Sequence, residues 1–455
     1  MIKDIDKDFQ KAKNGTILFL GKIHSLNREE IVFFLEKFNI QYVDMLNDDV
    51  SMAVEGTLMT PLDDEISYET YKKKIPAYTS EQFEKLYANA LNDDSILMSL
   101  KLSNDQKRLF RLLHNTHLDK ALFVKLFSMY DWGEEGLFDT SENMEICTLF
   151  SKRFYHKERF DPATFYSPIS IFEIAIMSED ADVLEALFFV PELEIKQSRN
   201  RSSQKRPRSI KEALATNHFI KRNTLERLTR LNSRDVDYFL AQNTLIDDDI
   251  AHMLLERGDS ETIESLSCNA SLGNEVFARL ITHDALLENI VHYQKIDLTR
   301  YKMLKKFHDA IGFNENLTEE VVALLLDDGD KNTLVHLAKN SAIDKRFLNI
   351  LFQLNEKEIF VALAQNPSLG AEQIKVLSEM KSEEIDLALA LNESASLEVL
   401  EVLYNKDNFD INKHLALNAS VPLEHLQQLQ LDTRLLNYLK ENSTFTEAIL
   451  NKLGI

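Results

Sequence analysis

Asparagine recurs at a fixed interval along the second half of this 455-residue sequence. From Asn314 the next four members follow at steps of 26 residues, and a second series with the same step begins at Asn217. A last member comes 24 residues after the first series, as a shortened final copy would place it. Leucine stands eleven residues after each of these asparagines, so the register indicates an internal repeat. The repeat asparagines are Asn217, Asn243, Asn269, Asn314, Asn340, Asn366, Asn392, Asn418 and Asn442.

The apolar positions within one copy predict two short helices. Offsets 8 and 11 from the asparagine, as in Leu348 and Leu351, lie on one face of a first helix. Offsets 19 and 23, as in Ile359 and Leu363, lie on one face of a second. The asparagine ends the second helix, where we expect the left-handed backbone conformation of a C-terminal cap. Its side chain is then placed to bond with free backbone groups of the turn.

A single copy is not expected to fold alone. Burying about six apolar side chains stabilises a copy by roughly 1.5–3 kcal/mol each. Ordering its backbone costs more, because each residue loses roughly 1–2 kcal/mol of conformational entropy. Neighbouring copies must therefore stack and bury each other's apolar faces.

The pattern Leu-Ala-x-Asn-(Pro)-x-Leu resembles the leucine-rich repeat variant family, which is related to HEAT-type solenoids. The resemblance covers residues 210–455 and implies a right-handed α-solenoid built from 26-residue, two-helix repeats. Some members of that family carry an iron–sulfur cluster on a Cys-rich segment. This chain has two cysteines, Cys147 and Cys268, which lie far apart, so we expect no cluster, no metal and no other cofactor.

The residues before the regular array are expected to be helical but irregular. Asn89 and Asn115 are also 26 residues apart, and apolar residues follow Asn115 at helical spacing. Beyond residue 128 the register is lost, although apolar spacing still favours paired helices. We therefore assign 92–195 to irregular helical hairpins, 196–209 to a loop and 210–455 to the array.

Residues 1–91 predict a small α/β domain instead. Ile17–Leu20 is a short apolar run, typical of a buried strand, and helical spacing follows it. Continued through residue 91, this reading gives the order β-α-β-β-α-β-α, with Ser80 as the N-cap of the last helix. With Gly21 after the first strand, the order resembles a BRCT domain, a module that binds phosphopeptides or DNA ends. The resemblance implies a phosphate pocket, for which Gly21, Lys72 and Lys73 are the candidates.

Charge is unevenly distributed along the chain, whose net charge is −22. Residues 196–234 hold 12 basic and 2 acidic residues, whereas the segments on either side are acidic. The basic loop 196–209 has almost no apolar residues, so it is either a solvated linker docked on an acidic face of the chain or a contact for nucleic acid or an acidic partner. Its cations are Lys196, Arg199, Arg201, Lys205, Arg206 and Arg208.

The sequence contains none of the common catalytic or nucleotide-binding motifs, and its 11 glycines are few for a chain of this length. We therefore expect a non-enzymatic scaffold that binds a partner protein or peptide, of basic character, on the concave face of the acidic solenoid. The alternative is a nucleic-acid-binding or DNA-maintenance accessory protein that uses the BRCT-like domain and the basic loop. The polar N-terminal segment and the isolated cysteines favour the cytoplasm, and no apolar run is long enough to span a membrane.

Overall fold

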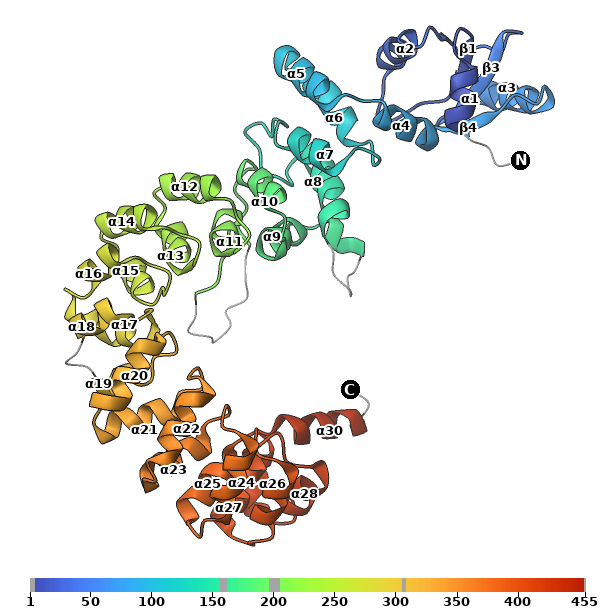
Figure 1. Cartoon of the computed structure of the whole chain (residues 1–455). Helices are drawn as coiled ribbons and strands as arrows, with labels where there is room; N and C mark the ends of the chain where they lie inside the picture. The colour runs from blue at the N-terminus through green and yellow to red at the C-terminus, as the bar shows by residue number, and fades with distance from the viewer. Residues whose placement is uncertain (1–4, 156–161, 196–204, 305–307, 454–455) are drawn as a thin grey trace. The chain divides into compact units, whose positions relative to one another are not determined.

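The computed structural model describes residues 5–155, 162–195, 205–304 and 308–453. Over these residues the chain is mainly helical, and four short strands near the N-terminus form a sheet (Figure 1). The predicted class, mainly α with a small α/β part at the N-terminus, is confirmed at this level of detail. The chain divides into two compact units, Met1–Asn243 and Thr244–Ile455.

The N-terminal sheet consists of parallel strands in the spatial order β2-β1-β3-β4. β1 (Thr16–Leu20) lies between β2 (Gln41–Val43) and β3 (Val50–Glu55), and β4 (Ala77–Thr79) pairs with β3. All five residues of β1 are buried, as expected for a central strand of a parallel sheet that is covered on both faces.

Helices cover both faces of this sheet. On one face, Ile66 of α3 (Pro61–Lys72) packs with Leu18 and Leu20 of β1. On the other face, Phe19 of β1 contacts Phe83 of α4 (Ser80–Asn89), with ring centroids 5.1 Å apart. α2 (Arg28–Glu36) and α1 (Ile5–Lys11) add further aromatic rings to this second layer. The sheet is therefore the middle of three layers.

The order of strands and helices predicted for residues 14–91 is confirmed, and the N-terminal domain differs from the prediction in two details, one of them before residue 14. Helix α1 was not predicted, because Phe9 is the one buried residue in its seven positions and gives no apolar periodicity. The N-cap of α4 is Thr79 rather than Ser80, since the Thr79 hydroxyl accepts a hydrogen bond from the Gln82 amide at 3.3 Å.

Helices account for most of the remaining described residues of the first unit. α7 packs against α10, α8 against α9, and α11 against both α9 and α13. Their bounds are α5 (Asp93–Ser103), α6 (Gln106–Leu113), α7 (Lys120–Phe127), α8 (Ser141–Phe154), α9 (Pro168–Met177), α10 (Ala181–Phe188), α11 (Ile210–Thr216), α12 (Arg222–Arg230) and α13 (Arg234–Gln242).

The second unit begins with shorter, less regular helices. These are α14 (Asp248–Arg257), α15 (Ser260–Ser267), α16 (Asn274–Leu280), α17 (Leu287–Tyr293), α18 (Leu298–Leu304) and α19 (His308–Ile311). From Asn314 onward two kinds of helix alternate. The first helices follow a repeat asparagine: α20 (Glu319–Asp328), α22 (Lys345–Gln353), α24 (Ala371–Glu379), α26 (Leu397–Tyr404) and α28 (Leu423–Leu429). The second helices precede the next asparagine: α21 (Lys331–Lys339), α23 (Lys357–Gln365), α25 (Glu383–Leu391) and α27 (Phe409–Leu417). α29 (Leu436–Leu439) and α30 (Ser443–Leu453) follow.

The second helices stack directly on one another. α21 packs against α23, α23 against α25, and α25 against α27. One fully buried alanine lies near the end of each: Ala338, Ala364, Ala390 and Ala416. Small side chains at these positions allow neighbouring helix backbones to approach closely, as the Leu-Ala pairs in the sequence predict.

The conformation predicted for the repeat asparagines is wrong. Asn366 has φ −79° and ψ 118°, which is extended backbone, and Asn243, Asn340, Asn392 and Asn418 are alike. A left-handed cap would direct the chain back over its own helix. The extended conformation instead carries the chain onward into the next copy, and it leaves the side chain pointing toward the previous one.

Candidate interaction surfaces

The repeat asparagines connect each copy to the copy before it. The amide nitrogen of Asn366 donates hydrogen bonds to the carbonyls of Ala338 at 2.8 Å and Asn340 at 3.0 Å. Its Oδ1 accepts a hydrogen bond from the Ser368 amide at 2.8 Å. Asn392 and Asn418 make the corresponding bonds. Because both N–H donors of each amide are used within the protein, these buried residues stabilise the array rather than bind a ligand.

Gln294 takes the place of an asparagine that the sequence lacks. Its amide nitrogen donates to the carbonyls of Leu266 at 3.1 Å and Ser267 at 3.0 Å, and its side chain is fully buried. Asn314 in turn donates to the Gln294 carbonyl at 2.8 Å. Sequence reasoning missed this residue because it followed asparagine alone. The signal was the 45-residue gap between Asn269 and Asn314, which is too long for one copy.

The phosphate-binding candidates lie at opposite ends of the parallel strands of the N-terminal sheet. Gly21, with φ 69°, follows the carboxyl end of β1. Lys72 and Lys73 end α3, which runs from the carboxyl end of β3 back to the amino end of β4. There Lys72 Nζ lies 4.2 Å from the Tyr68 ring centroid, and Lys73 Nζ lies 3.2 Å from Asp48 Oδ1. The structure does not bring these three candidates together into a pocket.

The basic loop is described in part. Three of its cations lie outside the described residues: Lys196, Arg199 and Arg201. Lys205 Nζ lies 2.7 Å from Asp235 Oδ1 and 4.7 Å from the ring centroid of Tyr238, both in α13. Arg206 and Arg208 are exposed. At its described end, the loop is therefore held against an acidic residue of its own chain.

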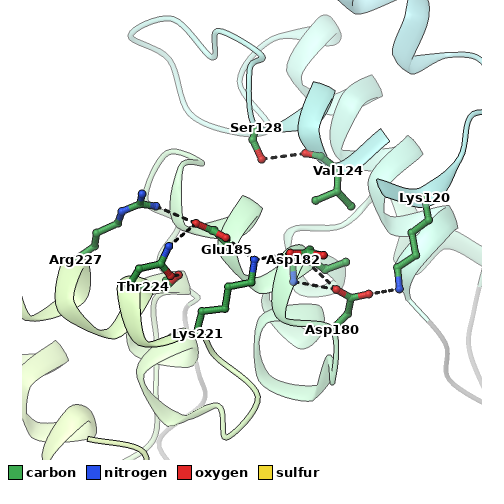
Figure 2. Close-up of polar contacts among 11 residues, drawn as sticks. Lys120, Val124, Ser128, Asp180, Asp182, Glu185, Lys221, Thr224 and Arg227 are labelled. Atoms are coloured by element: carbon green, nitrogen blue, oxygen red, sulfur yellow. Dashed lines mark hydrogen bonds and ion pairs between the residues drawn. The ribbon is translucent and has the colours of Figure 1, made fainter. Parts of the chain in front are cut away.

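Glu185 of α10 lies at the centre of a polar network between α10 and α12 (Figure 2). Its carboxylate is 2.7 Å from Lys221 Nζ, 3.3 Å from Arg227 Nη1 and 2.9 Å from Asn223 Nδ2. Burial raises the pKa of Glu185, but the hydrogen bonds from Lys221 and Asn223 and the nearby positive charges outweigh burial and lower the pKa overall.

Other cations near this network also contact the chain itself. Lys221 pairs with Asp182, and Lys120 of α7 pairs with Asp180 (Figure 2). Lys211 Nζ donates to the carbonyl of Phe188, the last residue of α10, at 2.5 Å and to that of Val190 at 3.0 Å. Burial lowers the pKa of Lys211 to about 8. A nucleic-acid contact requires cations that face solvent. Several cations in residues 205–230 instead neutralise acidic residues or cap a helix.

The first helices from α20 to α28 carry more acidic residues than the second helices of the regular array. They contain nine acidic and three basic residues. The second helices α21, α23, α25 and α27 contain five acidic and four basic residues. Among the described residues, the exposed carboxylates of Glu372, Glu379, Glu398 and Glu401 have no ion-pair partner. The two faces of the array are therefore chemically different.

Apolar side chains also reach the surface on four successive first helices, ten residues after the repeat asparagines from Asn314 to Asn392. Ile350, Val376 and Val402 are 44%, 45% and 50% exposed, and Leu324 is partly exposed at the same offset. We call these four residues the aliphatic row. In the following copy the offset is occupied by Gln428, whose Oε1 accepts a hydrogen bond from the Tyr404 hydroxyl at 2.5 Å, so the row ends there.

The described residues contain no group of three or more His, Cys, Asp or Glu side chains placed to hold a metal ion. None of the helices within those ranges combines the length and apolar character that crossing a bilayer requires.

No protein-family model matches this chain, and no curated protein or solved structure is significantly similar to it. Its function is therefore inferred from the chemistry of its own surfaces.

Proposed function

We propose that this protein is a non-enzymatic scaffold that binds a partner protein through the first-helix face of residues 319–429. One observation carries the proposal: four aliphatic side chains reach the surface in register, beside carboxylates that lack ion-pair partners. Contiguous exposed apolar surface with a polar border is typical of protein interaction sites. A row that runs across several repeats suits an elongated protein segment better than a small molecule.

We also propose that residues 210–455 form a right-handed α-solenoid of the leucine-rich repeat variant type. The direct stacking of second helices and the asparagine bonds between copies support this architecture. For the N-terminal domain we propose a BRCT-like relationship, supported by its order of strands and helices. A structural or pairing role fits this domain better than phosphate binding, because Gly21 and Lys72 lie at opposite ends of its parallel strands.

The proposed binding face differs from the concave face expected from the sequence. Second helices that approach closely through buried alanines favour curvature toward the second-helix side. The first helices then lie on the convex side. We favour this side because the acidic excess and the aliphatic row both occur there, and because an acidic face favours a basic partner. Cytoplasmic residence remains part of the proposal.

Site-specific photo-crosslinking tests this function. A photoreactive residue replaces either Gln353 on a first helix or Gln365 on a second helix, both of which are exposed, in the full chain within the cells that produce it. We expect one predominant protein adduct from position 353 and little from position 365. The crosslinked protein, once purified, should bind the wild-type chain saturably. Equal adducts from both positions, or no specific adduct from either, would contradict the proposal.

A further inference from the structure

The geometry of the aliphatic row limits the kind of segment that can cover it. Packed helices lie about 8–10 Å apart, so four residues on successive first helices span about 24–30 Å. A helical partner presents residues i and i+7 on one face about 10.5 Å apart, close to this spacing. An extended strand repeats the same face every 6.6–6.8 Å or so, which does not match one contact per copy. A helix of about 22 residues therefore matches the whole row.

The charged residues beside the aliphatic row indicate which residues the partner helix carries on its two sides. Glu372, Glu379, Glu398 and Glu401 lie on the same first helices as Val376 and Val402, and their carboxylates lack ion-pair partners among the described residues. Lys375 is the one basic residue of α24 and α26. A helix about 10 Å wide that rests on the row places its lateral residues near these carboxylates. Lysine and arginine at those lateral positions complement them.

We propose that the first-helix face binds a basic amphipathic α-helix of a partner protein. Apolar residues at heptad spacing contact Leu324, Ile350, Val376 and Val402, and lysine or arginine residues face the glutamates. The inference rests on the proposed function and adds to it the identity of the binding surface and the chemistry of the partner.

A designed peptide provides the first test. The probe is a fluorescent 22-residue helix with leucine at heptad positions and lysine or arginine on both flanks, and its binding to the full chain is followed by fluorescence anisotropy. We expect saturable binding that weakens as salt is raised. A peptide of the same composition with two central prolines cannot form the helix and should bind about tenfold more weakly or worse. Equal binding of the two peptides would overturn a helical occupant.

Matched variants test the surface. The triple variant Ile350→Ser, Val376→Ser, Val402→Ser removes the exposed apolar contacts, and Glu372→Gln, Glu398→Gln, Glu401→Gln removes three charges. Each should weaken the probe about tenfold or more. The control Glu358→Gln, Glu383→Gln, Asp410→Asn removes three exposed charges from the second helices and should leave affinity within about twofold. Circular dichroism and urea unfolding establish that each variant is folded.

The outcomes separate this inference from the proposed function. Affinity that is unchanged in both first-helix variants, or reduced only in the control, would overturn the basic-helix inference. If the crosslinked cellular partner then still binds the wild-type chain, the scaffold function stands and the partner uses another chemistry. Absence of a specific cellular adduct contradicts the scaffold function itself, whatever the peptide does.

Discussion

The side-chain amide of Asn392 donates a hydrogen bond to the main-chain carbonyl of Asn366, 3.2 Å away and 26 residues earlier in the chain. Asn366 makes the same bond to Asn340. Each asparagine is thus both a donor to the previous copy and an acceptor for the next. The register of the sequence repeat is therefore a register of hydrogen bonds that connect consecutive copies.

Replacing one member should destabilise the array. Asn366→Ala leaves the buried carbonyls of Ala338 and Asn340 without their side-chain donor, and we expect a loss of about 2–3 kcal/mol in the free energy of unfolding. Asn332→Ala, at an exposed position of α21, should cost less than about 0.5 kcal/mol. Urea unfolding followed by circular dichroism measures both. Equal urea midpoints of unfolding for the two variants would show that the side-chain hydrogen bonds of Asn366 contribute little to stability.

Gln294 should tolerate neither truncation nor shortening. Gln294→Ala removes two hydrogen bonds to buried carbonyls, and we expect it to cost about 1–3 kcal/mol. Gln294→Asn restores the amide group but places it one methylene short of Leu266 and Ser267, so it should recover little stability. A thermal scan of the three proteins provides the comparison. Full recovery with asparagine would mean that side-chain length at this position is unimportant.

Acid should weaken the network around Glu185. Because its pKa is lower in the folded chain than the ordinary 4.5, Glu185 contributes stability above about pH 4.5 that is lost as the pH falls through the lower folded value. Glu185→Gln should therefore cost about 1–2 kcal/mol at pH 7, and this difference should shrink below pH 4.5. Urea titrations at several pH values measure the change. The partly exposed Glu226, which pairs with Arg222 and Arg230 of its own helix, is changed to Gln as the control. A difference independent of pH would exclude ionisation of Glu185 as its source.

The two cysteines should differ strongly in reactivity. Cys147 is fully buried, and burial raises the pKa of its thiol, whereas Cys268 is exposed. We expect Ellman's reagent to titrate one thiol per chain rapidly in the folded protein and the second only after unfolding. Cys268→Ser should abolish the rapid phase. A rapid phase that persists in this variant would show that Cys147 is accessible to the reagent.

Nucleic-acid binding should be weak and independent of the described part of the basic loop. The variant Lys205→Gln, Arg206→Gln, Arg208→Gln and the wild type should shift a DNA duplex equally little at about 150 mM salt, because Lys205 pairs with Asp235 and the flanking surface is acidic. Strong, salt-dependent binding by the wild type that the variant loses would instead favour the nucleic-acid alternative.

Local patterns predicted the elements well but not the partners of their residues. The β-α-β-β-α-β-α order followed from short apolar runs and helical spacing, which are properties of adjacent residues. The phosphate pocket was not formed because Lys72 and Lys73 end a helix that returns to the end of the strands opposite Gly21. The asparagine conformation was mispredicted for a similar reason. Helix-capping rules consider neighbours in sequence, whereas the acceptors for Asn366 lie 26 and 28 residues earlier.

The aliphatic row was present in the sequence but could not be distinguished from the core. Offsets 8, 10 and 11 are all apolar in several copies, as in Ile374, Val376 and Leu377. Packing between copies buries Ile374 and Leu377 almost completely and leaves Val376 at the surface. Which of three neighbouring apolar columns faces solvent depends on the rotation of each helix within the stack, and periodicity within one helix does not fix that rotation.

The asparagine hydrogen bonds between copies all have the same polarity. Each asparagine amide donates toward the N-terminus, as in Asn442 to the Asn418 carbonyl at 2.9 Å. The carbonyl of Asn442 itself accepts from the amide nitrogen of Thr446 in α30, 3.0 Å away. During synthesis, each newly emerged copy meets acceptors that the ribosome has already released. The nascent array can therefore order itself vectorially, one copy after another, without waiting for the rest of the polypeptide.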